Sequence, residues 1–97
     1  VVAVGEFGRS PRINKNTGRD HWPAVGGGVL AGGGLAHGQT VGATDRQGGS
    51  ITSQRLSPAD IAATIYRHLD IAPETTYVDA AGRPRFILES GRPIDDL

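Results

Sequence analysis

The side chains best suited to acid, base or metal chemistry gather between residues 6 and 21. Glu6 directly follows an apolar run, and Asp20 and His21 are adjacent near the end of the same polar stretch. Hard divalent cations favour carboxylate oxygen, and zinc or manganese sites accept carboxylate together with imidazole. These three residues are therefore candidate metal ligands. A structural interpretation also fits, in which Asp20 caps a turn and His21 is hydrogen-bonded beside Trp22.

Arginines lie between these candidate ligands, at Arg9, Arg12 and Arg19. Nine of the ten basic residues in the chain are arginine, whose planar guanidinium suits bidentate contacts with carboxylate, phosphate or sulfate. Arg9 is the best candidate for binding an anionic substrate because it lies close behind Glu6. A surface salt bridge explains Arg9 equally well.

The elements around these residues place them at the end of a strand. Val1-Val2-Ala3-Val4 predicts a fully buried strand that begins without an initiator Met or a leader. We therefore expect the chain to be part of a larger protein. The polar segment 5–22 is too long for a simple connector, and it starts where open α/β sheets bind their ligands. It is a candidate functional loop.

The next segments are rich in glycine and polar residues. Residues 26–34 fit either a short strand or a flexible linker, and we favour the strand. The glycine spacing matches no phosphate-binding fingerprint. Residues 39–42 predict a further short strand, and residues 45–54 predict a polar surface loop.

The clearest element is a helix in the second half of the chain. Ser57 can cap it, with Pro58 at the first helical position. Apolar residues then repeat at helical spacing along one face: Ile61, Ile65 and Leu69. We predict a helix over residues 58–69.

The C-terminal part is predicted to be extended. Residues 75–78 are extended or irregular, residues 80–84 turn the chain, and residues 85–88 form a final strand. Residues 91–93 are its expected hairpin partner. Asp95 and Asp96 have no basic neighbour in the sequence, which indicates a solvated tail.

Composition excludes several functions. The formal net charge is zero, and the absence of a basic stripe argues against general nucleic-acid binding. The chain has no cysteine, so it contains neither disulfides nor thiolate chemistry. No run approaches the roughly 20 apolar residues of a membrane helix. With 37% hydrophobic residues and 15 glycines, the core is expected to be thin.

Six motifs together resemble one bacterial family. They are Gly5-Glu6-Phe7-Gly8-Arg9-Ser10-Pro11, Gly18-Arg19-Asp20-His21-Trp22-Pro23, Leu30-Ala31-Gly32-Gly33-Gly34, Val41-Gly42-Ala43-Thr44-Asp45, Asp60-Ile61-Ala62-Ala63-Thr64-Ile65-Tyr66 and Gly91-Arg92-Pro93-Ile94. This set resembles the domain-of-unknown-function family 1501 and covers essentially the whole chain.

That family is similar to the superfamily of sulfatases, alkaline phosphatases and phosphopentomutases. The resemblance implies the C-terminal fragment of a three-layer α/β fold that holds two metal ions at the ends of its strands. In such enzymes a late strand ends in Asp-His-Gly, and a further His follows. By resemblance Glu6 takes the place of the Asp and His21 that of the later His. Phe7 departs from the pattern, because a phenyl ring cannot ligate a metal.

The resemblance implies a segment of a metal-dependent hydrolase acting on phosphate or sulfate esters. Glu6 and His21 would bind a divalent cation (zinc, manganese, calcium or magnesium), Asp20 would be a ligand or orient His21, and Arg9 would bind the substrate. The nucleophile is expected in the missing N-terminal part of the same chain, and the parent in the periplasm or secreted. Two alternatives are a non-catalytic extracytoplasmic binding or scaffold protein with a degenerate site, and a free-standing small binding module.

Overall fold

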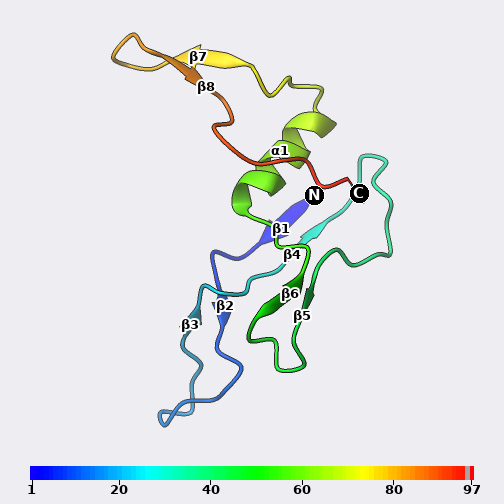
Figure 1. The fold of residues 1–97 in the computed structure, drawn as a ribbon, viewed down its shortest axis with the longest axis vertical. Coiled ribbons are helices and arrows are strands. Elements are labelled where there is room, and N and C mark those ends of the chain that lie inside the picture. Colours follow the sequence, from blue (N-terminus) through cyan, green and yellow to red (C-terminus); the bar gives the residue numbers. More distant parts are fainter. Residues whose placement is uncertain (96) are drawn as a thin grey trace. The chain divides into compact units, whose positions relative to one another are not determined.

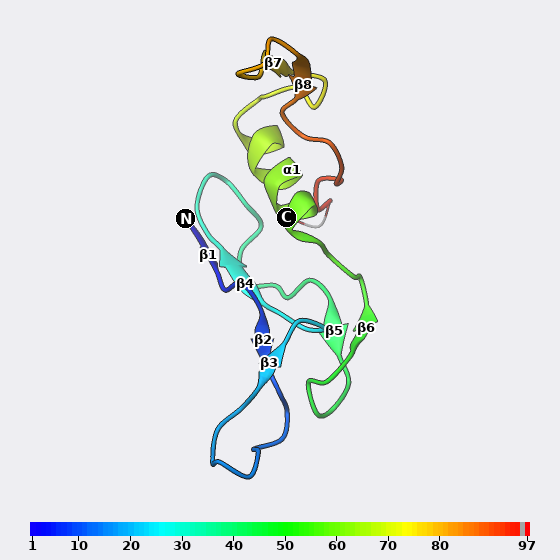
Figure 2. The same ribbon diagram turned by 90° about the vertical axis from the view of Figure 1, so that its left-hand side faces the viewer.

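The computed structural model describes residues 1–95 and residue 97 (Figures 1 and 2). The chain divides into two compact units, Val1–Arg55 and Leu56–Leu97, each with its own set of contacts. The described residues form one α-helix and four two-stranded antiparallel sheets. The mixed α/β class is thus confirmed, whereas the three-layer fold stays a prediction.

The first unit contains three of the strand pairs. Its strands are β1 (Val2–Val4), β2 (Gly8–Arg9), β3 (His21–Trp22), β4 (Gly28–Leu30), β5 (Ala43–Thr44) and β6 (Ile51–Ser53). β1 pairs with β4, β2 with β3, and β5 with β6, all antiparallel. The predicted strands at the start of the chain and in the glycine-rich segment are confirmed, and the candidate loop 5–22 contains β2 and β3.

The residues of this chain do not bury β1, so the burial expected for it within a larger protein stays a prediction. Val4 is 57% exposed, and Val29 on the partner strand is 63% exposed. Ala3 lies opposite Val29, and Val2 lies opposite Leu30, so apolar side chains occupy both faces of the ribbon. Two paired strands by themselves supply no second layer. Valines that a covered sheet would bury therefore remain accessible.

The next hairpin was placed incorrectly by the sequence prediction. The strand expected at residues 39–42 lies instead at β5, because Gly42 has a φ of +82°, which interrupts extended backbone. The expected loop 45–54 contains β6. Its turn is closed by Asp45, whose Oδ1 accepts the backbone N–H groups of Gln47 at 3.1 Å and Gly49 at 2.8 Å. The polar segment 45–54 therefore contains the turn and the second strand of a hairpin.

The second unit begins with α1 (Pro58–His68), one residue shorter than predicted. The Ser57 Oγ accepts the Asp60 backbone N–H, and the Asp60 Oδ2 accepts the Ser57 backbone N–H at 2.7 Å. This capping box satisfies donors that the first helical turn leaves without partners. Leu69 is the C-cap. Local sequence chemistry thus determines where this helix starts.

The chain returns along one face of α1 near its C-terminus, as Figure 1 shows in orange and red. The Asp60 Oδ1 accepts the Arg92 N–H at 2.8 Å, and the Thr64 Oγ1 accepts the Ile94 N–H at 2.9 Å. The Arg67 Nη2 donates to the Ile94 carbonyl at 2.5 Å. The three helix residues are four and three positions apart, so they share one face. They hold the returning segment in place.

Gly91 permits this close approach. A Cβ at Gly91 would collide with the backbone carbonyl of Ala59, and its φ is +101°. Both features require glycine. Beside this contact Ala63, Thr64 and Ile94 are buried, and they form the small core of the second unit.

Asp95 is solvated as predicted, with a 93% exposed side chain, but the expectation that it has no basic partner is wrong. The Asp95 Oδ1 forms an ion pair with the Arg67 Nη1 at 3.1 Å, because Arg67 already reaches the neighbouring Ile94 carbonyl. Asp96 lies outside the described residues.

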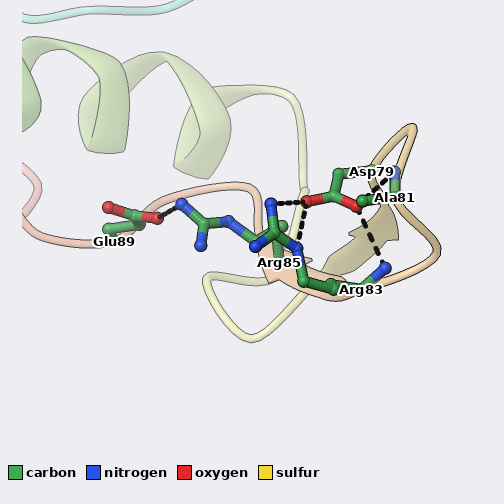
Figure 3. Close-up of polar contacts among 5 residues, drawn as sticks. All are labelled: Asp79, Ala81, Arg83, Arg85 and Glu89. Carbon is green, nitrogen blue, oxygen red and sulfur yellow. Dashed lines mark hydrogen bonds and ion pairs between the residues drawn. The ribbon is translucent and has the colours of Figure 1, made fainter.

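In the second unit a hairpin joins β7 (Thr76–Val78) to β8 (Pro84–Phe86) (Figure 3). The Asp79 Oδ1 accepts the backbone N–H groups of Ala81 at 2.9 Å and Arg83 at 3.0 Å, and its Oδ2 pairs with the Arg83 Nη2 at 3.0 Å. The predicted final strand is therefore present, but its partner is β7. The expected pairing with residues 91–93 is wrong, because those residues contact α1.

No helix in residues 1–95 and 97 is long and apolar enough to cross a membrane.

Candidate metal and anion site

The β2–β3 hairpin positions the candidate residues. In its register Gly8 lies opposite Trp22 and Arg9 opposite His21. The ladder continues outward through the Ser10 N–H, which donates to the Asp20 carbonyl at 2.9 Å. The hairpin therefore brings His21 opposite Arg9. Arg9 is three residues after Glu6 in the sequence.

A close backbone crossing fixes this end of the hairpin. A Cβ at Gly8 would run into the carbonyl of Val25, and the Val25 N–H donates to the Trp22 carbonyl at 3.3 Å. The chain leaving β3 therefore turns directly over Gly8. Any larger residue at this position would displace the turn.

His21 lies against Phe7. The two ring centroids are 4.0 Å apart with an interplanar angle of 31°, so the two rings are in direct contact. His21 and Glu6 are both exposed. Among the described residues the Glu6 carboxylate forms no hydrogen bond and no ion pair. The structure thus places the His21 imidazole beside the residue that follows Glu6.

Asp20 is directed differently. Its Oδ1 accepts a hydrogen bond from the Asn14 Nδ2 at 2.9 Å. Neighbouring residues of an extended ladder project to opposite faces, so Asp20 and His21 point away from each other. His21 lies opposite Arg9 in the ladder, whereas the Asp20 carboxylate faces the loop. The turn role that was the alternative for Asp20 matches these contacts.

Ser10 is a buried residue that sequence reasoning missed. It is 6% exposed, its Oγ donates to the Arg12 carbonyl at 2.8 Å, and the same Oγ accepts the Asp20 N–H at 3.0 Å. One hydroxyl therefore ties both strands to the loop. The only sequence signal was a serine before proline, which is typical of many turns.

Arg9 and Arg19 brace the same loop. The Arg9 Nη2 donates to the Arg19 carbonyl. The Arg19 Nη1 donates to the carbonyls of Ser10 and Pro11, each at 2.7 Å. Part of the donor set of Arg9, the candidate substrate residue, is thus used within the hairpin. A guanidinium carries five N–H donors, so Arg9 keeps donors for an anion.

Asn14 and Trp22 complete the loop's support. The Asn14 Oδ1 accepts the backbone N–H groups of Asn16 at 3.0 Å and Gly18 at 3.1 Å, which is the contact pattern of an Asx turn. The Trp22 Nε1 donates to the Gly49 carbonyl at 2.8 Å and ties β3 to the β5–β6 turn. Neither residue was predicted, although an asparagine four residues before a glycine was a usable turn signal.

The donor set fits a metal only in part. Glu6 and His21 offer a carboxylate and an imidazole, whereas protein zinc sites use three or four ligands. Within residues 1–95 and 97 no three His, Cys, Asp or Glu side chains are grouped so that they could hold a metal ion. An ion at this hairpin would need donors in addition to these two.

The whole chain, residues 1–97, matches one family model, described as "Protein of unknown function (DUF1501)". The protein belongs to this family, and the resemblance drawn from its motifs is confirmed at that level. No curated protein matches the chain. No solved structure matches it either.

Proposed function

We propose that the chain is a segment of an extracytoplasmic metal-dependent hydrolase that acts on phosphate or sulfate esters, with Glu6 and His21 as ligands of a divalent cation. The contact between Phe7 and His21, at 4.0 Å between ring centroids, carries this proposal. It brings the His21 imidazole against the residue that directly follows Glu6, and the Glu6 carboxylate has no partner among the described residues.

The chain's own residues would bind and orient. Glu6 and His21 supply one oxygen and one nitrogen donor, and Phe7 restricts the rotation of the His21 ring. A divalent cation in such a site polarises an ester oxygen or activates a water molecule. The nucleophile and the remaining ligands are expected outside this chain, as the family resemblance implies.

Arg9 would hold the anionic group of the substrate. It lies directly opposite His21 across the ladder, so both side chains project from the same face. Its bond to the Arg19 carbonyl restrains the guanidinium beside that face. Charge-assisted hydrogen bonds to a phosphate or sulfate oxygen are about twice as strong as neutral ones.

A second candidate function is non-catalytic binding with a degenerate site. Phe7 favours it, because its ring packs on His21 instead of offering a ligand. A protein that kept the fold and lost the chemistry would retain this packing and the braced loop.

Metal content and ester hydrolysis in the natural full-length protein distinguish the two functions. With His21→Ala we expect bound metal and hydrolysis of aryl phosphate or aryl sulfate to fall together, because one ligand serves both. With Arg9→Gln we expect bound metal to be retained and the substrate KM to rise. His37→Ala is the matched control, since that imidazole belongs to a different turn, where its Nε2 accepts the Gly32 N–H at 2.9 Å.

Three results decide the outcome. A metal-free wild type that is inert toward both ester classes overturns the hydrolase proposal. A metal-loaded but inert wild type supports the non-catalytic function with Glu6 and His21 as structural ligands. Equal metal loss in His21→Ala and His37→Ala contradicts the assignment of His21.

A further inference from the structure

The net charge of the chain is zero because one unit is basic and the other is acidic. The first unit has six basic residues, Arg9, Arg12, Lys15, Arg19, Arg46 and Arg55, against three acidic ones, Glu6, Asp20 and Asp45. The second unit has four basic residues against seven acidic ones. A basic unit is therefore covalently joined to an acidic one, and such asymmetry indicates an anionic partner.

Within the part of the chain that the structure describes, the cations of the first unit have no partner of opposite charge. All three ion pairs of the described residues lie in the second unit. In the first unit the Asp20 carboxylate accepts from the Asn14 amide, and the Asp45 carboxylate accepts backbone N–H groups of its own turn. These carboxylates stabilise turns instead of neutralising the arginines.

Arg12, Lys15 and Arg46 are the free cations of two neighbouring turns. Their side chains are exposed and form no hydrogen bond or ion pair within residues 1–95 and 97. By contrast, Arg9 and Arg19 already donate to backbone carbonyls of the hairpin.

The two turns are held together. The Trp22 Nε1 of the first hairpin donates to the Gly49 carbonyl in the turn of the second at 2.8 Å. A Cβ at Gly49 would lie 3.4 Å from the Pro11 Cγ, so the residue before Arg12 contacts the turn that carries Arg46. Side chain to backbone bonds of Ser10 and Asn14 fix the loop. The two turns that carry the three cations are thus braced and in contact with each other.

We propose that this surface, formed by the loops 11–19 and 45–50, binds an acidic polysaccharide through the sulfate or carboxylate groups along its chain. Separate guanidinium and ammonium groups on two turns suit a linear polymer whose charges are also separate. The proposal is independent of the metal site, because none of the three cations belongs to that site.

Other polyanions fit less well. Single-stranded nucleic acid is bound through aromatic side chains on which the bases stack, whereas Phe7 contacts His21 and Trp22 bonds to Gly49. Insertion into an anionic membrane needs a sizeable apolar surface between the cations. Ile13, 64% exposed, is the one large apolar side chain on loop 11–19.

The test measures binding of the natural full-length protein to dextran sulfate and to hyaluronate, with neutral dextran as the blank, over a range of salt concentrations. We expect binding to both acidic polymers that weakens as salt rises. The double variant Arg12→Gln with Lys15→Gln should weaken this binding about tenfold or more, because each cation near an anionic surface changes the affinity roughly fivefold. Arg83→Gln with Arg85→Gln removes the same charge from ion-paired sites and should change it less than about twofold.

Several results would overturn the inference. They are the absence of salt-dependent binding, equal losses in the two double variants, and tighter binding to single-stranded DNA or to phosphatidylglycerol vesicles than to dextran sulfate. Circular dichroism of both variants confirms that a loss reflects the surface and not the fold, since the Arg12 and Lys15 side chains make no bonds that folding needs. Polymer binding in a protein without bound metal would support this inference while the hydrolase proposal failed.

Discussion

The two units use charged side chains in opposite ways. In the first unit Ser10, Asn14 and the backbone ladders maintain the structure, and Arg12 and Lys15 remain exposed. In the second unit Asp60, Asp79 and three ion-paired arginines are part of the structure itself. The same charged residue types therefore have different roles in the two units. Three arginines of the second unit form ion pairs, whereas Arg12 and Arg46 of the first unit are available to a ligand.

The largest expected effect tests how closely the C-terminal segment packs against α1 in the second unit. Gly91→Ala places a Cβ against the Ala59 carbonyl at a φ of +101°. Strain and overlap together should cost at least about 3 kcal/mol of unfolding free energy. Gly82→Ala is the control, because its φ is +77° but nothing lies within 4 Å; it should cost about 1–2 kcal/mol. Urea unfolding measures both, and equal costs would contradict the close contact.

The next effect compares one buried hydroxyl in each unit. Ser10→Ala leaves the Asp20 N–H without its acceptor, and Thr64→Val does the same to the Ile94 N–H. Each change should lower the free energy of unfolding by about 1–3 kcal/mol. It should also accelerate hydrogen exchange of the amide that lost its acceptor. Ser10→Thr and Thr64→Ser keep the hydroxyl and serve as controls. Unchanged exchange at Asp20 or Ile94 would show that the hydroxyl does not hold that strand or segment.

Acid should weaken the second unit. The backbone N–H of Arg92, with further hydrogen bonds from Ser57, lowers the pKa of Asp60 below its ordinary value of 3.8. The backbone N–H of Arg83 likewise lowers the pKa of Asp79. Because these pKa values are lower in the folded state, the stabilisation is complete above pH 3.8 and is lost as the pH falls below it.

The measurement is unfolding followed across this pH range. Asp60→Asn with Asp79→Asn should be less stable than the wild type at neutral pH and should lose less stability on acidification. Identical pH slopes in the variant and the wild type would refute the role assigned to these carboxylates.

The smallest effect concerns the exposed ion pairs of the second unit. Arg85→Gln removes the contact between the Arg85 Nη2 and the Glu89 Oε1 at 2.9 Å (Figure 3). Exposed pairs contribute about 0.2–1 kcal/mol, so the midpoint of urea unfolding should move slightly and still less in high salt. A larger shift would mean that this pair is a structural contact like that of Arg67.

Local chemistry made the helix predictable. The residues that start the helix are close together in the sequence: Ser57, Pro58 and Asp60. α1 ends one residue before the predicted limit. The hairpins were harder, since β5, β6 and β7 are only two or three residues long and no periodicity is visible over that length. Their turns depend on Asp45 and Asp79, which composition alone assigns to polar loops.

The candidate site was only partly predictable. Glu6 and His21 were selected from residue types and family resemblance, and the register places His21 opposite Arg9. The contact of Phe7 with His21 and the loop-facing position of Asp20 follow from that register. Strand pairing is a non-local choice that a single sequence does not specify. The metal itself stays a prediction.

The hydrogen bond from Trp22 to Gly49 also has an optical consequence. Trp22 is the single tryptophan of the chain and belongs to the first unit, while both tyrosines, Tyr66 and Tyr77, belong to the second. Selective indole excitation therefore monitors the contact between the β2–β3 and β5–β6 hairpins. Tyrosine absorbance monitors the helix and the β7–β8 hairpin. Each unit thus carries its own natural chromophore, and a single unlabelled sample can report which unit melts first.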